Sequence, residues 1–235
     1  MRSYAIVLGL LASATALTGC KGLFSPDNYD EPGSTLTGSV TYQGQPVPVA
    51  TEQVELDIWQ PGFDFEENIP VYVDQDGTFT AVLFNGDYEI NLRNGVGPWV
   101  DNSSRMSFTV SGSTTIEVPV TPYYTVGNAN IVNSGDVVQA TFTVNSVNTG
   151  REVNFVGLYV STTQFVDRTN QVVRVERNRA DIPDLNGTIN LSVALPSDIR
   201  VRPGPEPRTA VFARVGIAIV GKEDMVFSEV LEVGL

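Results

Sequence analysis

The stretch Asp74-Gln75-Asp76-Gly77 holds two carboxylates close together beside a glycine, a pattern that several kinds of chemistry use. It is compatible with calcium coordination, with acid–base catalysis by a carboxyl pair, or with the tight turn of a β-hairpin. A calcium loop of the helix–loop–helix type needs a longer series of oxygen ligands that ends in a glutamate at about loop position 12. The residues after Gly77 instead alternate like a strand, and Asp-Gly tolerates positive φ, so a hairpin turn is predicted here.

Trp59 is a candidate for ligand binding, because carbohydrate sites offer flat aromatic rings to sugars and polar side chains to hydroxyls. Trp59 has the same strand parity as Glu55 and Asp57, so its ring is expected on the polar face of the strand. A tryptophan there is a candidate stacking platform. The alternative is that Trp59 covers a strand end or a junction between domains.

The loop at residues 94–102 gives a second aromatic candidate, Trp99, in a context rich in glycine and side-chain amides. Trp99 with Asp101 and Asn102 combines a ring with hydrogen-bonding groups, which suits a carbohydrate. The alternative is that Trp99 folds back as a lid on the core or on the second domain.

The loop at residues 60–68 mixes phenylalanines with acids, and Asp64, Glu66 and Glu67 are weak candidates for calcium ligands. A partner-contact loop and a plain solvated loop are the alternatives. A glycosidase would need two carboxylates across a cleft, and none of the 27 acidic residues stands in a recognisable catalytic context. The sequence therefore assigns no catalytic residue, no cofactor and no firm metal site.

The composition excludes several classes of function. Histidine is absent, which removes the commonest general base and the commonest zinc ligand. The formal net charge of -13 argues against a nucleic-acid partner and against electrostatic docking on anionic lipid. Hydrophobic residues make up 42% of the chain and charged residues 17%, a balance typical of a folded protein with a core.

The first twenty residues predict a secretory signal followed by a lipid anchor. A basic start, an apolar run and small residues precede Leu17-Thr18-Gly19-Cys20, a pattern that resembles a bacterial lipobox. Cys20 is the only cysteine of the chain, and an acyl group on its thiol would anchor the protein to a membrane. The alternative is an ordinary signal peptide and a free cysteine. We therefore expect residues 1–19 to be cleaved and residues 20–34 to form a lipidated tether.

The rest of the chain predicts an all-β protein with two consecutive antiparallel β-sandwich domains. Apolar residues alternate with polar ones in short runs, for example at Val54, Leu56 and Ile58. About seven such runs precede residues 121–124, where Pro122 breaks the pattern. The domains are predicted at residues 35–121 and 122–235. Residues 152–161 are apolar on both faces, as expected of a central strand, and residues 196–208 hold four prolines and predict an irregular connection.

Several motifs resemble known folds. The N-terminal half is similar to the transthyretin-like, carboxypeptidase-regulatory-like fold, and the end of the C-terminal half looks like the last two strands of a fibronectin type III-like domain. The first resemblance is carried by Thr35-Leu36-Thr37-Gly38-Ser39-Val40, Gly44-Gln45-Pro46-Val47, Asp76-Gly77-Thr78-Phe79 and Asn85-Gly86-Asp87-Tyr88. The second is carried by Ala213-Arg214-Val215-Gly216-Ile217 and Phe227-Ser228-Glu229-Val230.

A further resemblance covers the whole chain after the signal. Asn28-Tyr29-Asp30-Glu31-Pro32 before the first strand, and later Gly97-Pro98-Trp99, resemble a family of two-domain lipoproteins of unknown function from Bacteroidetes. The genes of that family tend to accompany outer-membrane importers of the starch-utilisation type. The resemblance implies no catalytic residues. It implies a surface accessory of nutrient capture, with a glycan and importer subunits as candidate partners. Acidic residues after Cys20 also resemble a surface-export signal, which implies an outer-membrane protein that faces outward.

Two other functions compete with this one. Fimbrial subunits of the same phylum are also lipoproteins made of paired transthyretin-like sandwiches, and they polymerise by exchanging strands. A structural, adhesin-type subunit is therefore the alternative, and a glycan-active enzyme is the least favoured function.

Overall fold

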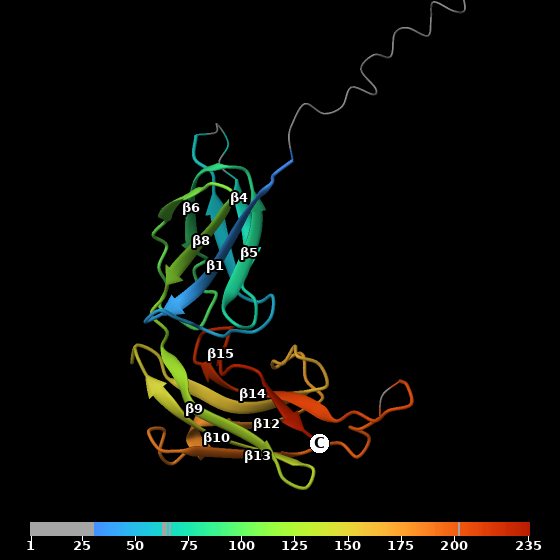
Figure 1. The fold of residues 1–235 in the computed structure, drawn as a ribbon. Helices are drawn as coiled ribbons and strands as arrows, with labels where there is room; N and C mark the ends of the chain where they lie inside the picture. Colours follow the sequence, from blue (N-terminus) through green and yellow to red (C-terminus); the bar gives the residue numbers. More distant parts are fainter. Residues whose placement is uncertain (1–30, 63–64, 66, 202) are drawn as a thin grey trace, which may run out of the picture. The chain divides into compact units, whose positions relative to one another are not determined.

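The computed structural model describes residues 31–62, 65, 67–201 and 203–235 (Figure 1). Within these residues the regular structure is sixteen β-strands and a short 3-10 turn at Arg179–Asp181, so the all-β prediction is confirmed. None of the described residues belongs to a helix long and apolar enough to span a membrane. Residues Gly33–Leu235 form one compact unit, which contains two β-sandwiches. The predicted signal and Cys20 lie outside the described residues.

The first sandwich packs two four-stranded sheets against each other. One sheet is centred on β1 (Ser34–Tyr42), which pairs with β2 (Gln45–Pro46), β5 (Thr78–Leu83) and β8 (Ser113–Pro119). The other has the order β4 (Asn68–Tyr72), β3 (Glu55–Trp59), β6 (Gly86–Leu92) and β7 (Met106–Val110). The strand pairs of this sandwich are antiparallel, as predicted, with one exception: β8 runs parallel to β1. After β7 the chain crosses from the β4–β3–β6–β7 sheet to the other sheet, where β8 pairs with β1.

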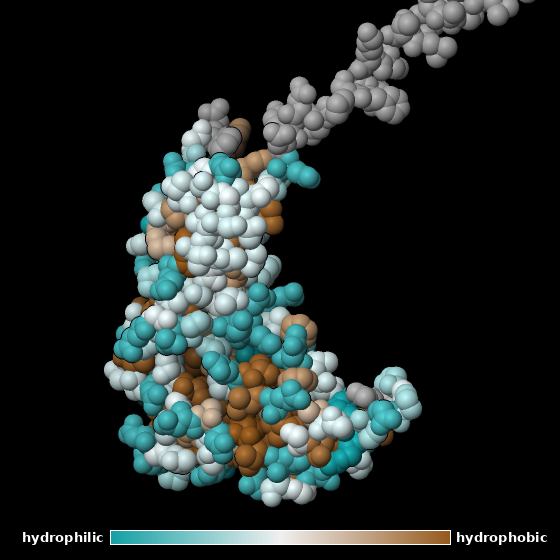
Figure 2. Space-filling view, viewed as in Figure 1, coloured by the Kyte–Doolittle hydropathy of each residue, from teal (hydrophilic) through white to brown (hydrophobic). Residues whose placement is uncertain are grey.

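The outer face of the β8–β1–β5 sheet is uncharged over most of its area. In Figure 2 it is pale, because small hydroxyl side chains cover it. These side chains include Thr35, Thr37, Ser39, Thr80, Ser113 and Thr115.

Gly38 on β1 leaves room for the Phe79 ring in the core of the first sandwich. Phe79 on β5 lies opposite Gly38 and is buried. A Cβ atom on Gly38 would lie 2.2 Å from the Cζ atom of the Phe79 ring. Gly38 and Phe79, both in the motifs that the sequence singled out, therefore pack directly against each other.

The Asp74–Gly77 segment is a turn, as predicted, but it does not close a hairpin. Gly77 has φ 85° and donates its N–H to the Asp74 carbonyl oxygen over 2.9 Å. The Asp76 carboxylate accepts the Thr78 N–H over 3.0 Å. However, β4 before the turn pairs with β3, whereas β5 after it pairs with β1 in the other sheet. The turn crosses between the sheets because the strands on its two sides belong to different layers.

The second sandwich packs a three-stranded sheet against a five-stranded one. The first has the order β13 (Ile189–Ala194), β10 (Val137–Ser146) and β9 (Tyr124–Asn133). The second has the order β12 (Val173–Asn178), β11 (Val153–Ser161), β14 (Ala210–Ile219) and β15 (Val226–Phe227), with β16 (Leu231–Gly234) also on β14. β11 is buried on both faces, so the prediction of a central strand is confirmed. The described residues of the proline-rich connection at 196–208 contain no strand, also as predicted.

Arg214 of β14 binds the two sandwiches together and is completely buried. Its Nη1 donates to the carbonyl oxygen of Val49 over 2.9 Å and of Gln75 over 3.3 Å, both in the first sandwich. Its Nε donates to the Val166 carbonyl oxygen, and its guanidinium lies 3.9 Å from the centroid of the Phe227 ring. Burial lowers the pKa of Arg214 to about 10. The guanidinium therefore takes the place of water for carbonyl groups at the junction.

Replacement of Arg214 by methionine is expected to destabilise the protein by about 3 kcal/mol or more. The apolar side chain would keep most of the volume but leave buried carbonyl oxygens without donors, at a cost of about 1–3 kcal/mol each. Urea unfolding followed by circular dichroism and tryptophan fluorescence measures the loss. Arg200→Met is the matched control, because Arg200 is exposed and pairs with Asp136 over 2.8 Å. That surface pair should contribute less than about 1 kcal/mol. Equal unfolding midpoints for the two variants would contradict this role of Arg214.

Candidate functional site

The outer face of the β4–β3–β6–β7 sheet carries the strongest candidate site, which we call the Trp59 face. It comprises Trp59, Glu89, Asn91 and Arg105 with the side chains next to them. Trp59 lies at the end of β3, opposite Glu89 of β6. Its ring points to the polar face, as the parity predicted, and its Nε1 donates to Asn91 Oδ1 over 2.6 Å. The hydrogen bond fixes the orientation of a ring that remains partly exposed.

Arg105, just before β7, lies against the Trp59 ring. Its guanidinium carbon is 4.0 Å from the ring centroid, which is the geometry of a cation–π contact. Its Nη1 also lies 3.2 Å from Glu89 Oε2. The ring is thus held from two sides by groups that can themselves bond hydroxyls.

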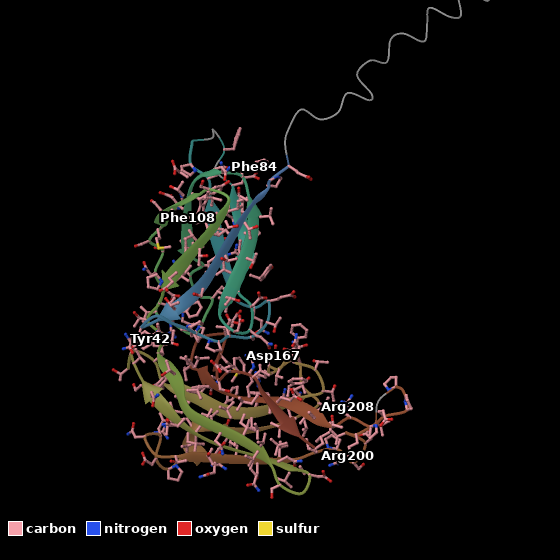
Figure 3. All side chains as sticks on the ribbon, viewed as in Figure 1. Tyr42, Phe84, Phe108, Asp167, Arg200 and Arg208 are labelled. Atoms are coloured by element: carbon pink, nitrogen blue, oxygen red, sulfur yellow. The ribbon has the colours of Figure 1, made fainter. Side chains whose placement is uncertain are left out.

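A shallow hollow of about 220 Å³ lies on β6 and β7, and its lining includes Glu89, the residue opposite Trp59. Its polar lining comes from Asp87, Glu89, Ser107 and Thr109, and Pro61 closes it on the side of the β3–β4 loop. Figure 3 labels Phe108, whose strand β7 forms one wall. Thr109 Oγ1 donates to Asp87 Oδ1 over 2.7 Å. A partly exposed ring can stack on a sugar face, and neighbouring carboxylate, amide and hydroxyl groups can bond the sugar's hydroxyls.

The acids of β3 on the same face are neutralised by Arg93. Arg93 pairs with Glu55 and, over 2.6 Å, with Asp57 Oδ1. Asn68 Nδ2 also donates to Asp57 Oδ1 over 2.5 Å. The hydrogen bond to Asp57 raises the pKa of Arg93. These contacts bind the two carboxylates into the sheet beside Trp59.

Trp99 does not offer its ring to solvent, so that prediction is wrong. The side chain is 1% exposed and belongs to the buried core, and the Trp99 backbone forms a bridge with Pro122. Gly97 makes this possible, because a Cβ atom there would lie 2.4 Å from the Trp99 ring, and its φ is 90°. The chain can therefore turn back and lay the indole on the core, which is the alternative that the sequence left open.

Asp101 joins the same loop to the second sandwich. Lys222 Nζ lies 2.6 Å from Asp101 Oδ1, and the Gly95 N–H donates to that oxygen over 2.9 Å. The hydrogen bond from Lys222 lowers the pKa of Asp101. Next to this contact, the Gly97 N–H donates to the buried Asp224 carboxylate over 2.9 Å. The predicted ligand loop is thus structural. We call its contacts with the second sandwich, Asp101 with Lys222 and Gly97 with Asp224, the clamp.

The remaining predicted site residues are Asn102 and the three candidate calcium ligands. Asn102 is exposed and its Oδ1 accepts the Ser104 N–H over 3.0 Å, which caps a local turn. Among the metal candidates, Asp64 and Glu66 lie outside the described residues, and Glu67 is exposed. The described part of the chain contains no cluster of three acidic or cysteine side chains that could hold a metal.

Sequence reasoning missed Asn91 and Arg105. The alternation along residues 87–93 places Asn91 on the outward face, so the parity that located Trp59 could have located Asn91 as well. Arg105 has no comparable signal, because it precedes its strand and reaches Trp59 only through the pairing of β6 with β7.

Two family models match the chain, the N-terminal domain of "Protein of unknown function (DUF3823)" over residues 34–121 and the C-terminal DUF3823 domain over residues 124–232. A DUF3823 protein from Parabacteroides merdae is 33% identical, with a TM-score of 0.77, and covers 87% of this chain and 100% of its own. One from Bacteroides ovatus is 29% identical, also with a TM-score of 0.77, over 86% and 99%.

A third solved structure shares the fold. It is a candidate carbohydrate-binding protein from Bacteroides uniformis, 17% identical, with a TM-score of 0.69, over 87% of this chain and 100% of its own. Among proteins with curated descriptions, no relative matches the chain.

Asp101 should stabilise the protein in a pH-dependent way. Its pKa in the folded protein lies below the ordinary value of 3.8, so its contribution is present above that value and is lost as the pH falls through the folded pKa. We expect Asp101→Asn to be less stable at pH 7 by about 1 kcal/mol or more, because Asp101 is partly exposed but the Lys222 side chain, which would lose its carboxylate partner, is buried.

Urea unfolding between pH 7 and pH 3 measures this difference. The difference in free energy of unfolding between the unaltered protein and Asp101→Asn should disappear below about pH 4. Asp181→Asn serves as the control, because Asp181 is exposed and outside the clamp, and its curve should follow that of the unaltered protein. A gap for Asp101→Asn that stays constant over the whole range would contradict the clamp.

Proposed function

The chain belongs to the DUF3823 family, and from this membership together with the Trp59 face we propose that it is a non-catalytic glycan-binding module. In this proposal a lipid on Cys20 anchors it in the outer membrane, facing outward. There it serves a nutrient-uptake system and meets the subunits of an outer-membrane importer.

The observation that carries the glycan-binding part is the setting of Trp59. Its partly exposed ring is fixed by Asn91 and contacts Arg105, and the opposite residue Glu89 lines a hollow with polar walls. Sugars present apolar C–H faces to such rings and hydroxyls to such polar groups. The candidate carbohydrate-binding protein from Bacteroides uniformis has the same fold, which supports this class of ligand.

The anchoring part rests on the sequence before the first strand. Cys20 precedes Ser34, the first residue of β1, by 34 − 20 = 14 residues. A chain of that length spans at most about 50 Å when fully extended. A lipid on Cys20 would therefore keep the first sandwich close to the membrane while leaving it free to meet a ligand.

Replacement of Trp59 by alanine should weaken glycan binding by at least about tenfold, which corresponds to about 1.4 kcal/mol. The test uses residues 21–235 on a broad glycan array, followed by calorimetry with the best ligand. Trp59→Phe should retain part of the affinity, because a ring remains. Phe84→Ala is the control, since Phe84, labelled in Figure 3, is an exposed aromatic residue that directly follows β5 of the other sheet.

Two results would count against this proposal in different ways. The absence of binding to every glycan on the array would refute the glycan-binding function. Glycan binding that Trp59→Ala leaves unchanged would refute Trp59 as the platform.

Replacement of Cys20 by serine should release the protein from the membrane fraction of the cells that produce it. Serine has no thiol to acylate, so an alkyne-labelled fatty acid should enter the unaltered protein and not the variant. Fractionation and labelling measure the two effects. A variant that still fractionates with membranes and still carries the label would rule out lipidation at Cys20.

A further inference from the structure

The chain has a second, larger concavity between the two sandwiches, which we call the junction groove. Its volume is about 670 Å³, within the range of about 300–1,000 Å³ that is common for ligand pockets. One wall comes from β2 and the Asp74–Thr78 turn, and the other from β9 and the segment that joins β15 to β16. The visible face of the second sandwich in Figure 2 also presents apolar side chains.

The walls of the groove are fixed by hydrogen bonds that cross between the sandwiches. Gln75 Nε2 donates to the Gln164 carbonyl oxygen over 2.9 Å, and Gln75 Oε1 accepts the Val166 N–H over 3.4 Å. The Phe227 N–H donates to the Pro48 carbonyl oxygen over 3.0 Å, and Arg214 binds Val49 and Gln75. A cavity held in this way is formed before a ligand arrives, so binding loses little freedom of the protein.

The lining combines apolar surface with hydrogen-bonding groups. Pro46, Pro48 and Val230 offer apolar contact, whereas Gln45, Asp76 and Glu229 offer amide and carboxylate groups. The Asp76 Oδ1 atom is engaged by Thr78, which leaves Oδ2 as an acceptor for a ligand. This mixture suits a molecule with many hydroxyl donors and some apolar C–H surface.

The charge of the lining narrows the class of ligand further. Two carboxylates face the groove, and its lining residues include neither lysine nor arginine. The Arg214 guanidinium lies close behind the wall and is buried against Gln75 and Phe227. An anionic ligand would therefore meet like charge without a cation exposed in the lining, which is unfavourable in a partly desolvated site. A neutral ligand avoids that cost and can donate to both carboxylates.

We propose that the junction groove is a second binding site, which takes neutral oligosaccharides and excludes anionic ones. This inference rests on the proposed glycan-binding function and adds to it a site remote from Trp59 and a class of sugar. Ligand at the Trp59 face should change the fluorescence of Trp59. Ligand in the groove should change it little, because neither tryptophan of the chain lines the groove.

The test compares neutral and acidic oligosaccharides of equal length by calorimetry on residues 21–235. The neutral probes are maltohexaose, cellohexaose, xylohexaose and mannohexaose, and the acidic probe is hexagalacturonate. Gln45→Trp fills the groove from an exposed rim position and should weaken binding of the neutral probe at least about tenfold.

A charge reversal tests the exclusion of anions. Glu229→Lys should improve the affinity for hexagalacturonate at least severalfold, because it replaces repulsion with attraction. Glu117→Lys is the matched control, since Glu117 is an equally exposed glutamate on the outer face of β8 and should change neither affinity. Urea unfolding of each variant checks that the fold is retained.

The outcomes separate the groove from the Trp59 face. Binding that Gln45→Trp abolishes and Trp59→Ala spares supports the groove. Binding that Trp59→Ala abolishes and Gln45→Trp spares overturns the groove and leaves the proposed function intact. Tighter binding of hexagalacturonate than of the neutral probes overturns the groove as proposed. No binding to any probe or to any glycan on the array overturns both the groove and the proposed glycan-binding function.

Discussion

The buried guanidinium of Arg214 is the interaction on which the arrangement of functional surfaces depends. A completely buried charge is costly unless its surroundings compensate it. Here the carbonyl oxygens of Val49, Gln75 and Val166 and the face of Phe227 provide that compensation. Asp167, also buried and labelled in Figure 3, is the acidic residue that raises the pKa of Arg214 against the effect of burial. Since these groups come from both sandwiches, the hydrogen bonds of the Arg214 Nε and Nη1 atoms fix the junction.

The same junction explains why one predicted ligand loop is structural and another surface remains open. Residues 94–102 look like a binding loop, with glycine, amides and an aromatic ring, yet Lys222 and Asp224 hold that loop through Asp101 and Gly97. Trp59 lies on a sheet face whose neighbouring charges are already paired by Arg93 and Arg105. Its ring is consequently held in place without being covered by the second sandwich.

Local alternation made the elements of the fold predictable. The parity of β3 placed Leu56 and Ile58 inside and Trp59 outside, because successive side chains of a strand point to opposite faces. The turn at Asp74–Gly77 followed from the conformations that glycine and aspartate tolerate. The assignment of strands to sheets was less accessible. The parallel pairing of β8 with β1 joins residues more than seventy positions apart, and the turn at Gly77 connects different layers instead of closing a hairpin.

The sequence by itself therefore determined the all-β class, the outward direction of Trp59 and the anchor candidate Cys20, because each depends on neighbouring residues alone. The tertiary structure decided that Trp99 is buried, that Asp101 meets Lys222, and that Asn91 and Arg105 surround Trp59. It also decided that the turn of Gln75 and Asp76 lines a groove with Glu229. These pairings join residues far apart in the chain, and only the packing of the sheets, with the neutralisation of buried charge, selects among them.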